Sequence, residues 1–176
     1  MRRRAATALA AAGLFVAGAA PASAEQSTTQ RFFSSRLQAD SETSREVRDL
    51  LRSNRGFVDR AVKFRDLTGD GKADAVVRVQ SGGAAGAIAL YVFSTDTGER
   101  GSGLKVVFRS EELERAETRI REDVLRYRSA RPAAGDELCC PSKLAESRLR
   151  WRDRRHRFDV VERREVAAGA PWGDQQ

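Results

Sequence analysis

Residues 61–80 read AVKFRDLTGDGKADAVVRVQ, and this stretch decides the fold class. Residues 61–65 alternate apolar and charged side chains, as a half-buried β-strand does. Residues 75–80 are rich in valine and predict a second strand. Gly69 and Gly71 lie between them in an Asp- and Gly-rich turn. The stretch therefore predicts a strand, a sharp turn and a second strand.

The sequence on either side of this stretch extends the same pattern. Residues 88–93 form a continuous apolar run, which predicts a centrally buried strand. Shorter runs predict strands over 104–109, 118–121, 124–128, 147–152 and 157–161. One helix is predicted upstream, over 41–53, because Val47, Leu50 and Leu51 recur at helical spacing. We expect an α+β fold, mainly an antiparallel β-meander of about eight short strands with one N-terminal helix.

The ends of the chain predict how it is divided. Residues 1–24 combine three arginines, an alanine-rich apolar run and the Ala-Ser-Ala end of a cleavage site, as in a secretory signal peptide. Residues 25–40 are polar without clear periodicity and predict a flexible lead-in. Within it, Phe32 and Phe33 are candidates to dock on the domain. A single α+β domain is expected over 41–166, with a C-terminal tail over 167–176. The prediction is a secreted, extracytoplasmic monomer without a transmembrane segment after signal cleavage.

The net charge of +7 is a weak guide to a partner. Without the three leader arginines, 29 basic residues face 25 acidic ones. The basic residues are nearly all arginine, with few aromatic side chains among them. We interpret this balance as favouring solubility, and nucleic acid as an unlikely partner.

The turn within residues 66–74, DLTGDGKAD, has the spacing of a calcium-binding loop. Oxygen side chains stand at its first, third, fifth and ninth positions, and glycine stands at the sixth. The predicted ligands of one structural calcium ion are Asp66, Thr68, Asp70, the backbone carbonyl of Lys72, and Asp74. The twelfth position is a valine instead of the bidentate glutamate of an EF-hand, and the flanks are strands. The alternative is a turn without an ion, in which the carboxylates cap backbone amides.

Cys139 and Cys140 are the only cysteines of the chain, and they are adjacent. We consider a vicinal disulfide that stiffens the loop, a reduced buried pair and bonds to other chains. Because neighbouring Cα atoms lie about 3.8 Å apart, and disulfides prefer about 4.4–6.8 Å, a vicinal bond is strained.

Arg148, Arg150 and Arg152 alternate with Leu149 and Trp151. This alternation places three guanidinium groups on one face of a strand, as a candidate site for an anionic polymer. The alternative is a solvated strand face whose arginines pair with nearby acids.

Several separate elements carry a resemblance to known families. Residues 64–77, FRDLTGDGKADAVV, resemble one FG-GAP-type (integrin-alpha-like) calcium-loop motif. This motif is followed by the glycine turn at 81–86, the segment GDELCCPS at 135–142 and Arg150-Trp151. The order of these elements along the chain resembles that in the LppP/LprE-like group of secreted actinobacterial lipoproteins and their soluble relatives. The lipobox cysteine of that group is missing here. The resemblance implies location and fold more than activity.

No catalytic constellation is identifiable, since the single histidine, His156, stands in a charged turn among arginines. We therefore expect a secreted non-enzymatic domain, stabilised by one structural calcium ion, that binds a cell-envelope polymer or a partner protein. One alternative is an anionic-polymer binder acting through Arg148–Arg157, and another is an extracellular hydrolase.

Overall fold

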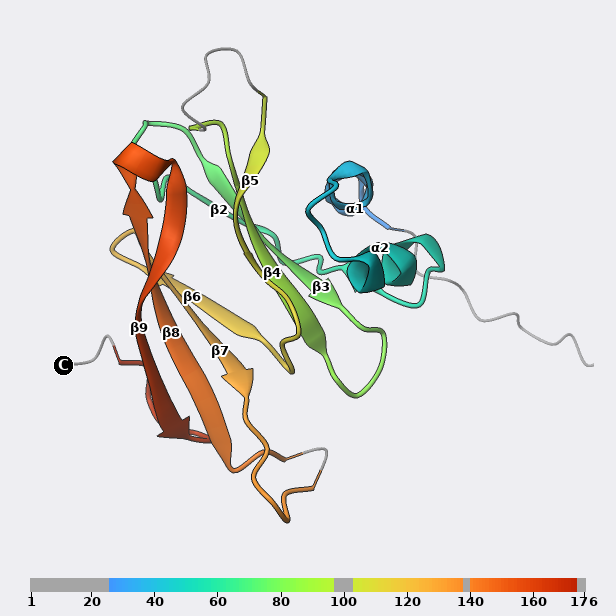
Figure 1. Cartoon of the computed structure of the whole chain (residues 1–176), viewed down its shortest axis with the longest axis vertical. Helices are drawn as coiled ribbons and strands as arrows, with labels where there is room; N and C mark the ends of the chain where they lie inside the picture. The colour runs from blue at the N-terminus through green and yellow to red at the C-terminus, as the bar shows by residue number, and fades with distance from the viewer. Residues whose placement is uncertain (1–25, 97–102, 138–139, 174–176) are drawn as a thin grey trace, which may run out of the picture.

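The computed structural model describes residues 26–96, 103–137 and 140–173. Within these ranges it has three layers (Figure 1). Two helices cover one face of a five-stranded sheet, and a four-stranded sheet packs on the other face. The predicted signal peptide lies outside the described residues.

Helix α1 (Thr28–Ala39) begins where the sequence predicted a flexible lead-in, so the prediction for residues 28–39 needs correction. Its start is fixed by a capping box, in which the Oγ of Ser27 accepts from the backbone N–H of Gln30 and Gln30 Oε1 accepts from that of Ser27. Phe33 and Leu37 are buried against the first sheet. The helix is therefore part of the domain core.

Helix α2 (Arg45–Arg52) corresponds to the predicted helix over 41–53 but begins later, at the N-cap Ser44. The Oγ of Ser44 accepts from the backbone N–H of Val47 at 3.3 Å. The backbone N–H of Ser44 in turn donates to the carboxylate of Glu111 at 3.2 Å, which ties the helix start to the first sheet. Val47 and Leu51 supply the buried face, as the helical spacing predicts.

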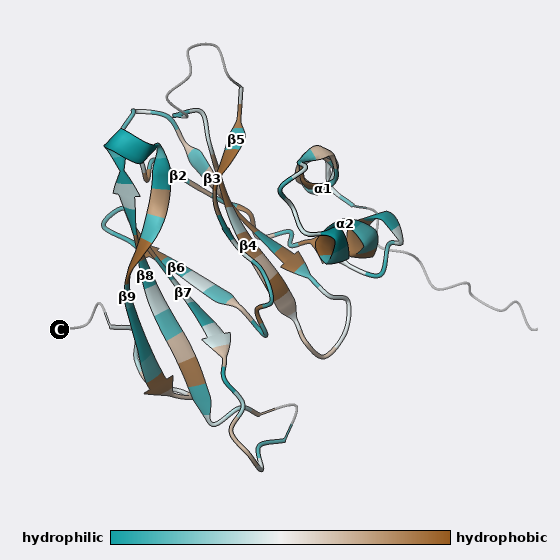
Figure 2. Ribbon diagram, in the orientation of Figure 1, coloured by the Kyte–Doolittle hydropathy of each residue, from teal (hydrophilic) through white to brown (hydrophobic). Residues whose placement is uncertain are grey.

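The first sheet contains β1 (Phe57–Val58), β2 (Lys63–Arg65), β3 (Asp74–Gln80), β4 (Ala87–Ser94) and β5 (Lys105–Ser110). Its order is β1-β3-β4-β5, with β2 also paired to β3, and the pairs are antiparallel. Val77 and Tyr91 face the helices, whereas Val76 and Leu90 face the second sheet. Burial on both faces explains the continuous apolar run of β4, which is brown in Figure 2.

The second sheet is an antiparallel meander of β6 (Glu117–Arg121), β7 (Val124–Ala130), β8 (Lys143–Arg152) and β9 (Arg157–Ala167). One face packs on the first sheet through Leu125, Tyr127, Leu149 and Phe158. We call the opposite face, which carries the alternate residues of these strands, the outer face. A short 3₁₀ turn, η1 (Asp153–Arg155), joins β8 to β9.

The predicted α+β class with mainly antiparallel strands is confirmed at this coarse level. In the described ranges there are two helices where one was predicted, and nine strands are divided between two sheets. β8 and β9 are longer than predicted, and Lys143 and Glu165 form an ion pair across the added part of their hairpin at 2.6 Å. The segment after β9 docks on the outer face, where the centroid of the Trp172 ring lies 4.2 Å from the guanidinium carbon of Arg128.

Candidate functional site

The predicted calcium loop connects β2 to β3 at one end of the first sheet. Gly69 and Gly71 have φ of 82° and 81°, which side-chain-bearing residues rarely adopt, so both glycines are required by the turn. The two carboxylate oxygens of Asp66 accept from the backbone N–H groups of these glycines, at 2.7 and 3.0 Å. The loop therefore folds around the side chain at its first position.

Asp74 closes the other end of the loop. One of its oxygens accepts from the backbone N–H groups of Leu67 at 2.8 Å and Thr68 at 3.0 Å. Burial raises the pKa of this carboxyl, although its hydrogen bonds act in the opposite direction. Asp70 caps the N–H of Lys72 at 2.9 Å.

These hydrogen bonds follow the pattern of the ion-free alternative, because each aspartate accepts from the loop's own amides. Among the residues that the structure describes, no three His, Cys, Asp or Glu side chains are grouped so that they could hold a metal ion. Thr68 is the exception to the internal pairing, since its Oγ1 is buried without a hydrogen-bond partner. The calcium ion therefore stays a prediction.

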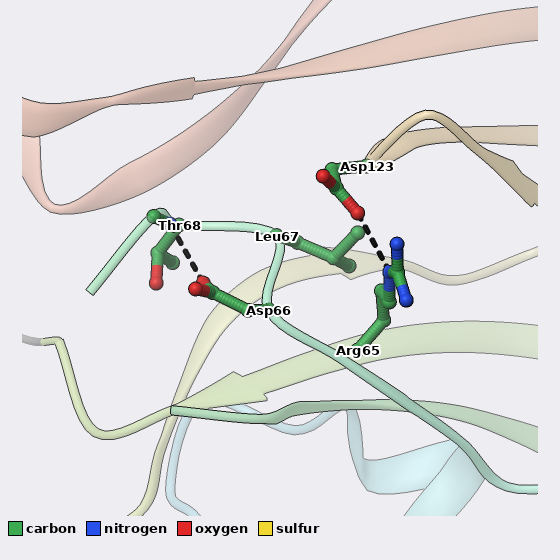
Figure 3. Close-up of a pocket in the computed structure, with 6 residues that line it drawn as sticks. Arg65, Asp66, Leu67, Thr68 and Asp123 are labelled. Carbon is green, nitrogen blue, oxygen red and sulfur yellow. Dashed lines mark hydrogen bonds and ion pairs between the residues drawn. The ribbon is translucent and has the colours of Figure 1, made fainter. Parts of the chain in front are cut away.

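A cavity of about 410 Å³ lies beside the loop (Figure 3). It is lined by Asp66 and Thr68 of the loop, and by Arg65 and Asp123, which form an ion pair at 2.6 Å. Asp123 belongs to the tight turn between β6 and β7, so the two sheets meet here.

The cysteine loop is described only in part, because Cys139 lies outside the described residues. Cys140 is exposed, and no free cysteine occurs in the described part of the chain. The loop is closed by Asp136, which accepts from the backbone N–H groups of Ala133 at 2.7 Å and Ser142 at 2.9 Å. These bonds lower the pKa of the Asp136 carboxyl. The vicinal disulfide stays a prediction.

The three arginines predicted as a stripe are brought to one face by β8. Leu149 and Trp151 point into the core between the sheets, so Arg148, Arg150 and Arg152 lie on the outer face. Part of this stripe is ion-paired. Arg148 Nε is 2.9 Å from a carboxylate oxygen of Glu162, and Arg152 Nε is 3.4 Å from one of Asp159. Arg150 and Arg152 are exposed.

A larger arginine array, which was not predicted from the sequence, lies on the same face. Cross-strand pairing places Arg119 of β6 opposite Arg126 of β7, and Arg126 opposite Arg148 of β8. These three residues, which we call the arginine row, are direct neighbours across three strands. They line a cavity of about 220 Å³ together with Arg121. The sequence does show alternating arginines on both sides of the tight turn at Glu122-Asp123. Only the pairing register of the strands shows that these arginines are neighbours.

Beside the arginine row, the outer face holds a buried ionic cluster centred on Glu146, of which 1% is exposed. Its carboxylate accepts from Arg128 Nε at 2.7 Å, from Arg164 Nη2 at 2.9 Å and from the backbone N–H of Gly173 at 3.2 Å. Burial acts to raise the pKa of Glu146, but the hydrogen bonds and charges of the arginines outweigh it and hold that pKa below its ordinary value. This cluster anchors the C-terminal segment to the sheet.

The only histidine of the chain, His156, has a partner in another segment: its Nδ1 is 3.0 Å from a carboxylate oxygen of Asp96. Its φ of 46° places it at the left-handed position of the turn after η1. The side chain therefore has a structural role in connecting the β8–β9 turn with the segment after β4.

Comparison of the chain with models of protein families, with curated proteins and with solved structures gives no match. The resemblance to the LppP/LprE-like group and to the FG-GAP motif therefore stays a prediction. Neither helix in the described ranges is long and apolar enough to span a membrane.

Proposed function

We propose that this chain is an extracytoplasmic, non-enzymatic domain that binds an anionic component of the cell envelope on the outer face of its second sheet. The observation that carries the proposal is the concentration of arginines there, on three neighbouring strands. The extracytoplasmic setting rests on the leader pattern of residues 1–24 and on the resemblance to secreted envelope proteins.

The ion pairs already present on this face are weak enough for a ligand to replace. Arg148 and its partner Glu162 are 40% and 39% exposed, and Arg152 is 43% exposed. Solvent-exposed pairs of this kind contribute only about 0–1 kcal/mol. An anionic polymer that meets several guanidinium groups at once can therefore displace the acidic partners at small cost.

The test is the salt dependence of binding to an anionic polymer. The double variant Arg150→Gln/Arg152→Gln removes two exposed charges from the outer face, and Arg45→Gln/Arg52→Gln removes two exposed charges from α2. We expect the first variant to bind more weakly and with a flatter dependence on salt, and the second to bind as the unmodified protein does. Equal losses in both variants would contradict a specific face.

A second candidate function is the stabilisation of the Asp66–Asp74 loop by calcium. It is supported by the buried, unpartnered Oγ1 of Thr68, which lines the same cavity as Asp66. Calcium takes oxygen ligands only, and a loop of neutral and anionic oxygens would serve it.

The measurement is the melting temperature of the protein in excess calcium and in chelator. Calcium at one hundred times its dissociation constant would stabilise the fold by about 2.7 kcal/mol. We expect this shift to disappear in Asp70→Asn and to persist in Asp153→Asn, an exposed aspartate in the β8–β9 turn. Equal melting temperatures with and without calcium would leave the loop as an ion-free turn.

A further inference from the structure

The arginine row is an unfavourable arrangement that requires an explanation. Like charges directly opposite each other on neighbouring strands destabilise a sheet. Arg119, Arg126 and Arg148 are direct cross-strand partners, so Arg126 has an arginine on either side. A sheet that maintains such a row gains from any ligand that supplies negative charge at that place.

Arg126, the middle member of the row, is short of hydrogen-bond acceptors. Only 14% of its side chain is exposed, and its Nη1 lies 3.6 Å from Glu146 and 3.9 Å from Glu162. These separations allow an ion pair but exceed the usual length of a hydrogen bond. Glu146 is already engaged by Arg128 and Arg164. The Arg126 guanidinium is therefore largely removed from water without strong replacement bonds.

Arg148 shows a similar deficit. Its Nε lies 2.9 Å from Glu162, yet that nitrogen is buried and makes no hydrogen bond. The side chain lines the 220 Å³ cavity together with Arg119, Arg121 and Arg126. The described residues that line this cavity include four arginines and one acidic residue, Glu122, while Glu146 and Glu162 lie beside Arg126 and Arg148. The cavity is thus a positively charged hollow between strands.

We propose that this cavity, which we call the arginine pocket, binds the phosphate group of a phosphate-bearing envelope polymer. The proposal deepens the proposed function and rests on it, since it names the charged group that the outer face recognises. A carboxylate presents its two acceptor oxygens in one plane. A phosphate presents oxygens in three dimensions, and it can accept from arginines on β6, β7 and β8 together.

The surroundings of the pocket favour a polymer over a lipid surface. Proteins that bind a membrane interface combine basic residues with apolar side chains that enter the headgroup region. The exposed phenylalanines of the described chain, Phe32, Phe57 and Phe64, belong to α1, β1 and β2, whereas the pocket lies on β6, β7 and β8. The pocket's neighbours on the outer face include the charged Arg128, Glu146, Glu162 and Arg164, and Trp172, whose ring packs on Arg128.

The experiment measures binding of the purified protein to poly(glycerol phosphate) and to polyglutamate of equal charge, at low and moderate salt. Arg126→Gln and Arg119→Gln each remove one charge from the pocket, and Arg154→Gln removes one from the exposed β8–β9 turn. We expect each pocket variant to lose roughly tenfold or more in affinity for the phosphate polymer, as for one charge-assisted hydrogen bond or more. Arg154→Gln should lose less than threefold. Melting curves verify that each variant is folded.

The outcomes separate the pocket from the wider proposal. If all three variants weaken binding equally, or if polyglutamate binds as tightly as the phosphate polymer, the pocket is refuted while the proposed function stands. If the unmodified protein binds neither polymer, both are refuted. Tighter binding to phosphatidylglycerol vesicles or to single-stranded DNA of equal phosphate number would refute the envelope polymer as the source of the phosphate. Should Arg126→Gln fail to fold, Arg119→Gln decides the question.

Discussion

Replacing Glu146 by glutamine tests the buried ionic cluster on the outer face. The substitution preserves the shape of the side chain and removes its negative charge. Glu146 is 1% exposed, and the side chain of Arg128 is 5% exposed, so both partners are shielded from water. With the carboxylate neutralised, Arg128 and Arg164 lose their common counter-charge, and Arg126 loses its nearer one.

The expected cost follows from this burial. Removing one partner of a buried ion pair costs about 3–5 kcal/mol, because the remaining charge is left uncompensated. In a protein of this size each kcal/mol shifts the melting temperature by roughly 2–4 °C. The Glu146→Gln variant should therefore melt roughly 6–20 °C below the unmodified protein.

The matched control is Glu165→Gln on the neighbouring strand β9. Glu165 forms an ion pair with Lys143 at 2.6 Å, but the two side chains are 57% and 50% exposed. We expect this variant to lose no more than about 1 kcal/mol. Thermal unfolding followed by circular dichroism compares the two variants. If Glu146→Gln melts within about 2 °C of Glu165→Gln, the assumed stabilisation by the cluster is wrong.

The same residue predicts a dependence on pH. The folded-state pKa of Glu146 lies below its ordinary value, because its arginine partners outweigh the effect of burial. Its contribution to stability is therefore complete above that ordinary value and is lost as the pH falls through the lower folded-state pKa. Glu146→Gln should remove this part of the acid sensitivity, which would appear as a smaller difference between variant and unmodified protein at low pH.

Two further substitutions test packing in the other layers, each by its urea midpoint. A Cβ at Gly56 would lie 2.5 Å from the carbonyl oxygen of Gln80, so Gly56→Ala should cost about 1–3 kcal/mol, whereas Gly83→Ala, whose Cβ would lie 4.0 Å from Ser81 Oγ, should be nearly neutral. Equal midpoints for these two variants would contradict the close approach of β1 and β3. Leu37→Ala should cost about 2–5 kcal/mol because the Leu37 side chain is fully buried on the inward face of α1, while Ser35→Ala, at an exposed position of the same helix, should cost far less. A neutral Leu37→Ala would mean that α1 is not part of the core.

The hairpin of β3 and β4 could be predicted from the sequence because its signal is local. Val76, Val77 and the run around Tyr91 are apolar regardless of distant partners, and Gly69 and Gly71 mark the turn before them. The calcium-loop spacing correctly identified a folded loop, but spacing alone does not determine whether the carboxylates face an ion or the loop's own amides.

Helix α1 could not be predicted in this way because its stabilising contacts are distant. Its inward face includes the polar Gln30, whose side-chain amide donates to the carbonyl of Val58 at 2.7 Å. A polar residue at a buried position interrupts the apolar periodicity on which helix prediction depends. The adjacent Phe32 is exposed, which blurs the pattern further. The capping box at Ser27 and Gln30 was the remaining local signal.

The arginine row was missed for a different reason. Each of its residues alone is an ordinary charged residue on a strand, and only the register of β6, β7 and β8 makes them neighbours. Register depends on the turn at Glu122 and Asp123, whose φ values of 50° and 61° suit a tight two-residue hairpin. The sequence indicated the turn, but the partner on β8 comes after a long loop.

Strands β3 and β4 supply side chains to both apolar clusters, one beneath the helices and one between the sheets. Neither outer layer can separate without exposing a face of these two strands to water. The three layers should therefore unfold in one cooperative transition, without a stable intermediate that lacks only the helices or only the second sheet. Amide protons of Val77 and Tyr91, at the centre of this shared hairpin, should exchange with solvent only through global unfolding.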